Sequence, residues 1–83
     1  MTAQGVRDPA LRARVAEAAR EEARHAYDTA VDALRAAWRE GRLGDVVPAW
    51  CAQARAYLRY LDAHEAWVDA LARERRERRE ARA

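Results

Sequence analysis

The sequence contains one cysteine, Cys51, and neither serine nor lysine. A single cysteine has no partner within the chain, so an intrachain disulfide cannot stabilise the fold. Without serine there is no serine nucleophile, and the sequence also lacks a glycine-rich phosphate loop and the H-E-x-x-H and C-x-x-C motifs. No histidine lies near Cys51 in sequence to activate its thiol. We therefore expect a protein that is not an enzyme and that binds no cofactor.

Long hydrophobic runs are also missing. No stretch approaches the ~18 apolar residues of a membrane-spanning helix, and the first residues lack the basic opening and apolar run of a secretory signal. These features favour a cytoplasmic protein. Glycine and proline are scarce, and neither occurs between Pro9 and Gly41, where alanine, leucine, arginine and glutamate dominate. Because these four are the strongest helix formers, the sequence predicts an all-α fold.

The few glycines and prolines divide the chain into two long helices. Asp8 before Pro9 is typical of an N-cap with proline at the first helical position. Gly41 is placed to end this helix in the left-handed conformation, with Leu43 supplying the accompanying hydrophobic contact. Asp45 is the predicted N-cap of the second helix. The sequence thus predicts a disordered segment at 1–7, a helical hairpin over 8–72 (helix 1 about 8–40, turn 41–44, helix 2 about 45–78) and a charged helical tail over 73–83.

Large apolar residues of the second helix recur at alternating spacings of three and four, which is typical of a coiled-coil seam. This apolar row consists of Val47, Trp50, Ala54, Tyr57, Leu61, His64, Val68 and Leu71. The first helix has alanine at the equivalent spacing, in Ala16, Ala19, Ala23, Ala26, Ala30, Ala33 and Ala37. Since the connection between the helices is only about four residues long, we predict that they fold back as an antiparallel hairpin.

The apolar row is too wide to be covered by one facing helix whose central row is alanine. Burying a large side chain is worth about 1.5–3 kcal/mol, and a domain has only about 5–15 kcal/mol in total. The sequence therefore predicts a homodimeric four-helix bundle, or docking onto another protein. The residues expected to contact the partner are Trp50, Tyr57, Leu58, Tyr60, Leu61, Trp67, Val68 and Leu71.

The charged tail permits two interpretations. Its arginines and glutamates form i,i+4 pairs that stabilise an exposed helix end, which is the simpler interpretation. The alternative is a basic arm on nucleic acid, as in a small DNA-binding or antitoxin-like regulator. The interleaved glutamates oppose phosphate binding, and a net charge of +2 does not demand it. The candidate residues are Arg73, Arg75, Arg76, Arg78, Arg79 and Arg82.

A third hypothesis is a ferritin-like metal-binding bundle. Glu22 and His25 form an E-x-x-H pair, the spacing that places a carboxylate and an imidazole on one helix face in di-iron bundles. A dimer of hairpins that supplied one such pair per chain, with Asp62, Glu65 or Asp69 of the second helix, would resemble the half-sized ferritin-like proteins. However, helical projection puts Glu22 and His25 on the edge away from the alanine row, and the sequence has no other E-x-x-H. We therefore expect Glu22 and His25 to be solvated and the chain to hold no metal.

The order Tyr27, Leu34, Leu43-Gly-Asp-Val-Val, Trp50 resembles small uncharacterised helical proteins of G+C-rich bacteria, a group linked in part to toxin–antitoxin gene pairs. Composition agrees with a bacterial origin of this kind, because arginine supplies all 16 basic residues and alanine is the commonest residue. The resemblance implies a protein that binds a protein partner, and it leaves open whether that partner is a toxin.

Overall fold

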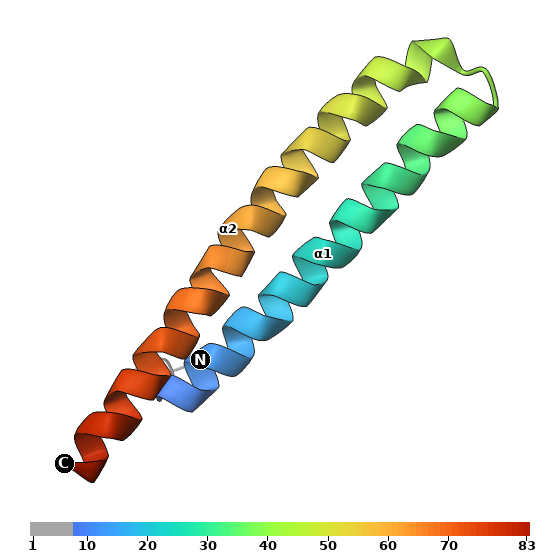
Figure 1. Cartoon of the computed structure of the whole chain (residues 1–83). Coiled ribbons are helices and arrows are strands. Elements are labelled where there is room, and N and C mark those ends of the chain that lie inside the picture. The colour runs from blue at the N-terminus through green and yellow to red at the C-terminus, as the bar shows by residue number, and fades with distance from the viewer. Residues whose placement is uncertain (1–7) are drawn as a thin grey trace.

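The computed structural model of the chain describes residues 8–83. Two helices, α1 (Pro9–Arg39) and α2 (Leu43–Arg82), run antiparallel and are joined by a short turn (Figure 1). The all-α helical hairpin predicted from the sequence is therefore confirmed. The segment 1–7, predicted to be disordered, lies outside the described residues.

The start of α1 follows the predicted capping. The Asp8 side chain accepts a hydrogen bond of 3.0 Å from the backbone N–H of Ala10, and Pro9 occupies the first helical position. This bond satisfies one of the N–H groups that a helix leaves without a partner at its first turn.

The end of α1 is a Schellman motif built on Gly41, which has a φ of 68°. The Gly41 N–H donates to the carbonyl of Trp38 (3.2 Å), and the Arg42 N–H donates to the carbonyl of Ala37 (2.9 Å). These two bonds define the motif, and its left-handed residue favours glycine. Leu43, expected to supply a hydrophobic contact to this motif, already belongs to α2, and its side chain is exposed.

The second helix begins earlier than predicted, and the assignment of Asp45 as its N-cap is wrong. Arg42 is the N-cap, without a side-chain cap, and the Asp45 N–H already donates to the Arg42 carbonyl (2.9 Å). The Asp45 carboxylate instead accepts a 2.8 Å hydrogen bond from the Arg42 guanidinium, which also donates to Glu40 at 2.7 Å. These bonds, first that to Glu40, raise the pKa of Arg42 above its ordinary value.

The helices pack through two inner rows of residues with heptad spacing. Every member of these rows is at least half-buried. The inner row of α1 is Ala13, Ala16, Arg20, Ala23, Tyr27, Ala30, Leu34 and Ala37; that of α2 is Val46, Ala49, Gln53, Ala56, Tyr60, Ala63, Trp67 and Ala70. Only Ala13, Ala37 and Val46 are buried outright among the described residues, so the core is thin.

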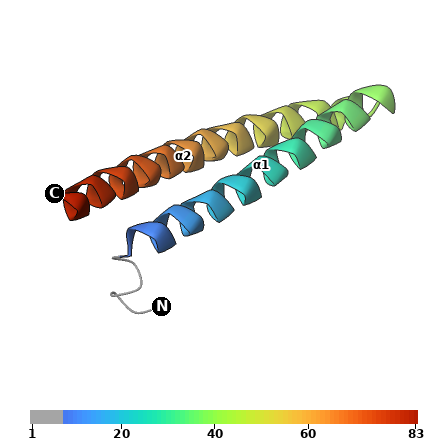
Figure 2. The same cartoon turned by 60° about the horizontal axis from the view of Figure 1, so that its bottom comes forward.

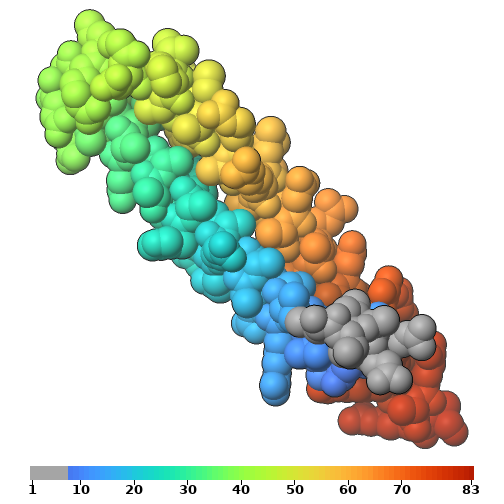
Figure 3. All heavy atoms as spheres, turned by 180° about the vertical axis from the view of Figure 1, so that it is seen from behind, coloured from blue at the N-terminus to red at the C-terminus, as the bar shows by residue number. Residues whose placement is uncertain are grey.

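The hairpin is a narrow rod rather than a globule. Its extents are 62 × 24 × 13 Å, and its radius of gyration is 17.9 Å, against about 12 Å for a compact domain of this length. Figure 3 shows α1 and α2 side by side along the rod, and Figures 1 and 2 show α2 continuing past the start of α1. The fold is thus a single layer, whereas domains are usually built from two packed layers.

Two glycine substitutions test the turn. Gly41→Ala should lower the free energy of unfolding by about 1–2 kcal/mol, because alanine is strained at positive φ. Gly44→Ala should raise it by about 0.5–1 kcal/mol, since Gly44 lies within α2 with open space at its Cβ position. Urea unfolding followed by circular dichroism measures both values at one protein concentration. Equal effects at the two glycines would contradict the turn described here.

Candidate interaction surface

Most of the apolar row predicted from the sequence is turned away from α1, although Tyr57 lies against Tyr27 (ring centroids 5.5 Å apart) and His64 accepts a hydrogen bond from Arg20. Each of its members follows an inner-row residue of α2 by one position, which turns it about 100° away from α1. As a result, its five largest exposed members are between 41% and 68% exposed. They are Val47, Trp50, Tyr57, Leu61 and Val68.

Residues of α1 share the face of the hairpin on which this row lies. Because the helices are antiparallel and both right-handed, the residue that follows an inner-row residue lies on the same face in either helix. Trp38 follows the buried Ala37, so it joins this apolar face near the turn, and it is exposed. Farther along, the α1 part of the face is mainly charged, with exposed Arg14, Glu17, Glu21, Arg24, Asp28 and Arg35.

The opposite face is lined by small residues. A shallow groove of about 250 Å³ lies between the helices there, and its walls are Ala19, Glu22, Ala23, Ala26, Ala56 and Arg59. The two faces therefore differ: one carries large apolar side chains, and the other has a groove walled by four alanines, a glutamate and an arginine. Five large, exposed apolar side chains of α2 gather on the first face.

Not all the residues predicted to contact a partner are exposed. Trp50, Tyr57, Leu61 and Val68 lie on the apolar face, and Leu58 lies exposed beside them on the outer side of α2. The remaining three, Tyr60, Trp67 and Leu71, are half-buried. Tyr60 and Trp67 belong to the inner row of α2, so their contact with a partner stays a prediction while their contact with α1 is observed.

Tyr60 and Trp67 contact Arg20, the one charged residue in the inner row of α1. The guanidinium carbon of Arg20 lies 4.6 Å from the ring centroid of Trp67 and 5.9 Å from that of Tyr60. Arg20 Nε donates to Nδ1 of His64 at 3.0 Å, and its Nη1 lies 2.9 Å from a Glu21 oxygen. This cluster ties the middle of α1 to α2 through charge-assisted hydrogen bonds and cation–π contacts.

The candidate metal ligands are not gathered into a centre. Glu22 and His25 are both exposed, and within residues 8–83 no group of three or more histidine, cysteine or acidic side chains is arranged to hold an ion. Cys51 is exposed on the outer side of α2.

The six arginines of the tail are divided by the structure. Five of them, Arg75, Arg76, Arg78, Arg79 and Arg82, line a single open depression with Ala72, and we call these five the arginine cluster. Arg73 is exposed but is not among the residues that line the depression.

No protein-family model, curated protein or solved structure matches the chain. Neither α1 nor α2 contains a segment long and apolar enough to cross a membrane.

The Arg20 cluster can be tested by removing its guanidinium. Arg20→Ala should lower the free energy of unfolding by about 1–3 kcal/mol, because it leaves His64 without its donor and removes the cation from the Tyr60 and Trp67 rings. Arg24→Ala is the matched control: Arg24 is exposed on the same helix, and its loss should change stability by less than about 0.5 kcal/mol. Urea unfolding gives both values. A similar loss for the two variants would show that the cluster does not hold the helices together.

Proposed function

We propose that the chain is a non-enzymatic interaction module that pairs with a second copy of itself through the apolar face, giving a homodimeric four-helix bundle. The observation that carries this proposal is the exposure of five large apolar side chains in one heptad register: Val47, Trp50, Tyr57, Leu61 and Val68. A regular row of this kind is the pattern that lets helices interdigitate as knobs into holes.

The energetics of the isolated hairpin support pairing. Full burial of one such side chain is worth about 1.5–3 kcal/mol. Because the five are roughly half exposed, covering them adds on the order of 1 kcal/mol each. Several kcal/mol is a large share of the 5–15 kcal/mol that stabilises a typical domain. A chain whose buried core among residues 8–83 is two alanines and a valine has much to gain from a second layer.

A second copy suits this face because a two-fold dimer needs one self-complementary patch. Two hairpins stacked on their apolar faces bring four helices together, and the exposed apolar side chains of both α2 helices are covered at once. The same face would suit a helical segment of another protein, as the resemblance to toxin–antitoxin-associated proteins implies. In either form the function needs no catalytic group, cofactor or metal, and we place the protein in the cytoplasm.

A charge placed in the apolar row should disrupt pairing. Leu61→Asp should raise the dimer dissociation constant by roughly 10²–10⁴-fold, because an uncompensated buried carboxylate costs about 3–5 kcal/mol. Absolute mass by light scattering on a sizing column, at several protein concentrations, should show the variant moving toward a single chain. Circular dichroism should show that its helicity is largely kept.

Ala66→Asp is the matched control. Ala66 is also exposed on α2 but precedes the inner-row residue Trp67, so it lies on the opposite face of the hairpin. This variant should keep the mass of the unaltered protein. If Leu61→Asp also kept it, or if the unaltered chain stayed a monomer at every concentration, self-association through the apolar face would be wrong.

A further inference from the structure

The net positive charge of the protein comes from the end of α2. Residues 72–83 contain six arginines and three glutamates, whereas the rest of the chain contains ten arginines and eleven acidic residues. The net charge of +2 is therefore the sum of a basic end and a slightly acidic body. A nearly balanced whole-chain charge conceals a local basic patch of the kind that binds anions.

At this end of α2, two of the three glutamates lie on the side that faces α1, and the arginine cluster lies around the depression. Glu74 and Glu77 continue the heptad spacing of the inner row of α2 and are half-buried toward α1. Glu77 pairs with Arg12 of α1 at 3.3 Å, and Glu74 pairs with Arg78. Within residues 8–83 these are the ion pairs of the tail. Glu74 and Glu77 thus do not line the depression formed by the arginines, although Glu74 neutralises Arg78, and Glu80 is exposed.

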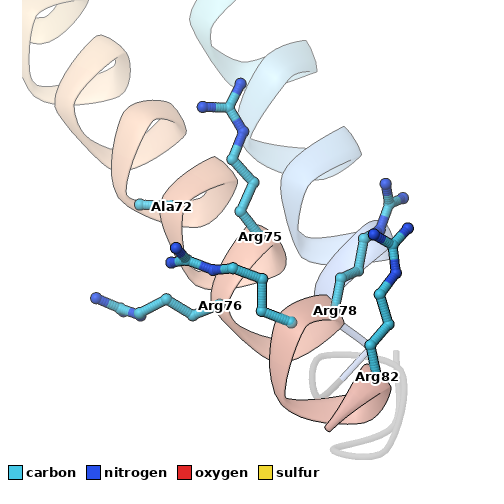
Figure 4. A pocket seen from close by; sticks show the side chains of 6 residues that line it. Ala72, Arg75, Arg76, Arg78 and Arg82 are labelled. Carbon is cyan, nitrogen blue, oxygen red and sulfur yellow. The ribbon is translucent and has the colours of Figure 1, made fainter.

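The basic side is the arginine cluster around the open depression, which has a volume of about 560 Å³ (Figure 4). Its lining contains no carboxylate, and Figure 4 shows Arg78 and Arg82 extending in the same direction from successive turns. Like charges three and four residues apart repel one another and destabilise a helix. An anion seated among them would remove this repulsion.

We propose that the arginine cluster binds the phosphate backbone of double-stranded DNA. The guanidinium group presents a planar fork of donors that matches phosphate oxygens, and it remains charged at all physiological pH values. Four of the five, Arg75, Arg76, Arg79 and Arg82, have no carboxylate within ion-pair distance among the described residues, so their charge is available. A row of guanidinium groups on successive helical turns suits a row of phosphates better than one small anion.

The composition of the tail favours duplex DNA over two other polyanions. A helix that lies on an anionic membrane needs large apolar side chains opposite its charges, and the apolar residues of 72–83 are all alanine. A site for single strands uses aromatic side chains on which bases stack, and the tail has none. Contacts from arginine to backbone alone fix position without reading sequence, so binding is expected to be independent of base sequence.

The test is fluorescence anisotropy of a short, labelled DNA duplex of mixed sequence, titrated with the full chain at several salt concentrations. Phosphate contacts from the four unpaired arginines predict a slope of about −3.6 in log K against log salt, or about a 150-fold loss of affinity between 50 and 200 mM. Replacing Arg75, Arg79 and Arg82 together by glutamine leaves Arg76 as the one unpaired arginine of the cluster and should reduce this slope to about −0.9. Replacing the same three residues by lysine should keep most of the slope, because lysine keeps the positive charge. The comparison shows whether the glutamine variant loses affinity through lost charge or through fraying of the helix.

Arg73 provides a matched control inside the tail. Arg73→Gln and Arg79→Gln remove the same charge from the same helix, but only Arg79 lines the depression. Arg79→Gln should reduce the slope by about 0.9, and Arg73→Gln should leave it unchanged. Equal effects of the two variants, no binding of the duplex at the lowest salt, or binding of phosphatidylglycerol vesicles in preference to the duplex would each overturn the proposal. Because Leu61 lies outside the cluster, the mass of the Leu61→Asp variant tests the apolar face separately.

Discussion

The contact between the two inner rows determines the character of every other surface of this protein. About half of the residues in those rows are alanine, so the helices meet largely along small side chains. Among the larger members, Arg20 contacts Tyr60 and Trp67, and Tyr27 lies against Tyr57. Because the alanine side chains are small, the helices approach closely and leave little room between them for further large side chains. The large side chains of α2 that follow the inner row therefore remain outside, and the hairpin alone cannot bury them.

The helices and their ends could largely be predicted from the sequence, because capping depends on local chemistry. Asp8 before Pro9 and the left-handed Gly41 both behave as expected. The start of α2 could not be predicted in the same way. The N–H of Arg42 completes the Schellman motif, and α2 begins at the next residue, Leu43. Asp45 therefore already lies inside the first turn of α2 and cannot be its N-cap. The geometry of the preceding turn, rather than the capping preference of aspartate, determines where α2 begins.

Which face of each helix packs against the other could not be predicted from local chemistry. The apolar row and the inner row of α2 run side by side with the same heptad spacing. The sequence favours the apolar row as the packing face because it is the more hydrophobic of the two. The structure places the other row against α1, since its alanines allow close approach and Tyr60 and Trp67 meet Arg20. Hydrophobicity indicates which row gains more from burial, but it does not show which row packs against α1. The same inner spacing, continued past Trp67, reaches Glu74 and Glu77, and this signal could have separated the tail glutamates from the arginines.

The apolar row and the arginine cluster are parts of one line along α2. Past Leu71, the same spacing of three and four continues through Arg75, Arg78 and Arg82. This continuity constrains the proposed dimer. If the two α2 helices ran parallel, the arginine clusters would lie side by side and repel each other within the bundle. An antiparallel pair places the clusters at opposite ends, beyond the apolar contact, where each stays accessible to a polyanion. The charge at the end of the row thus favours one orientation that the apolar residues alone would leave undetermined.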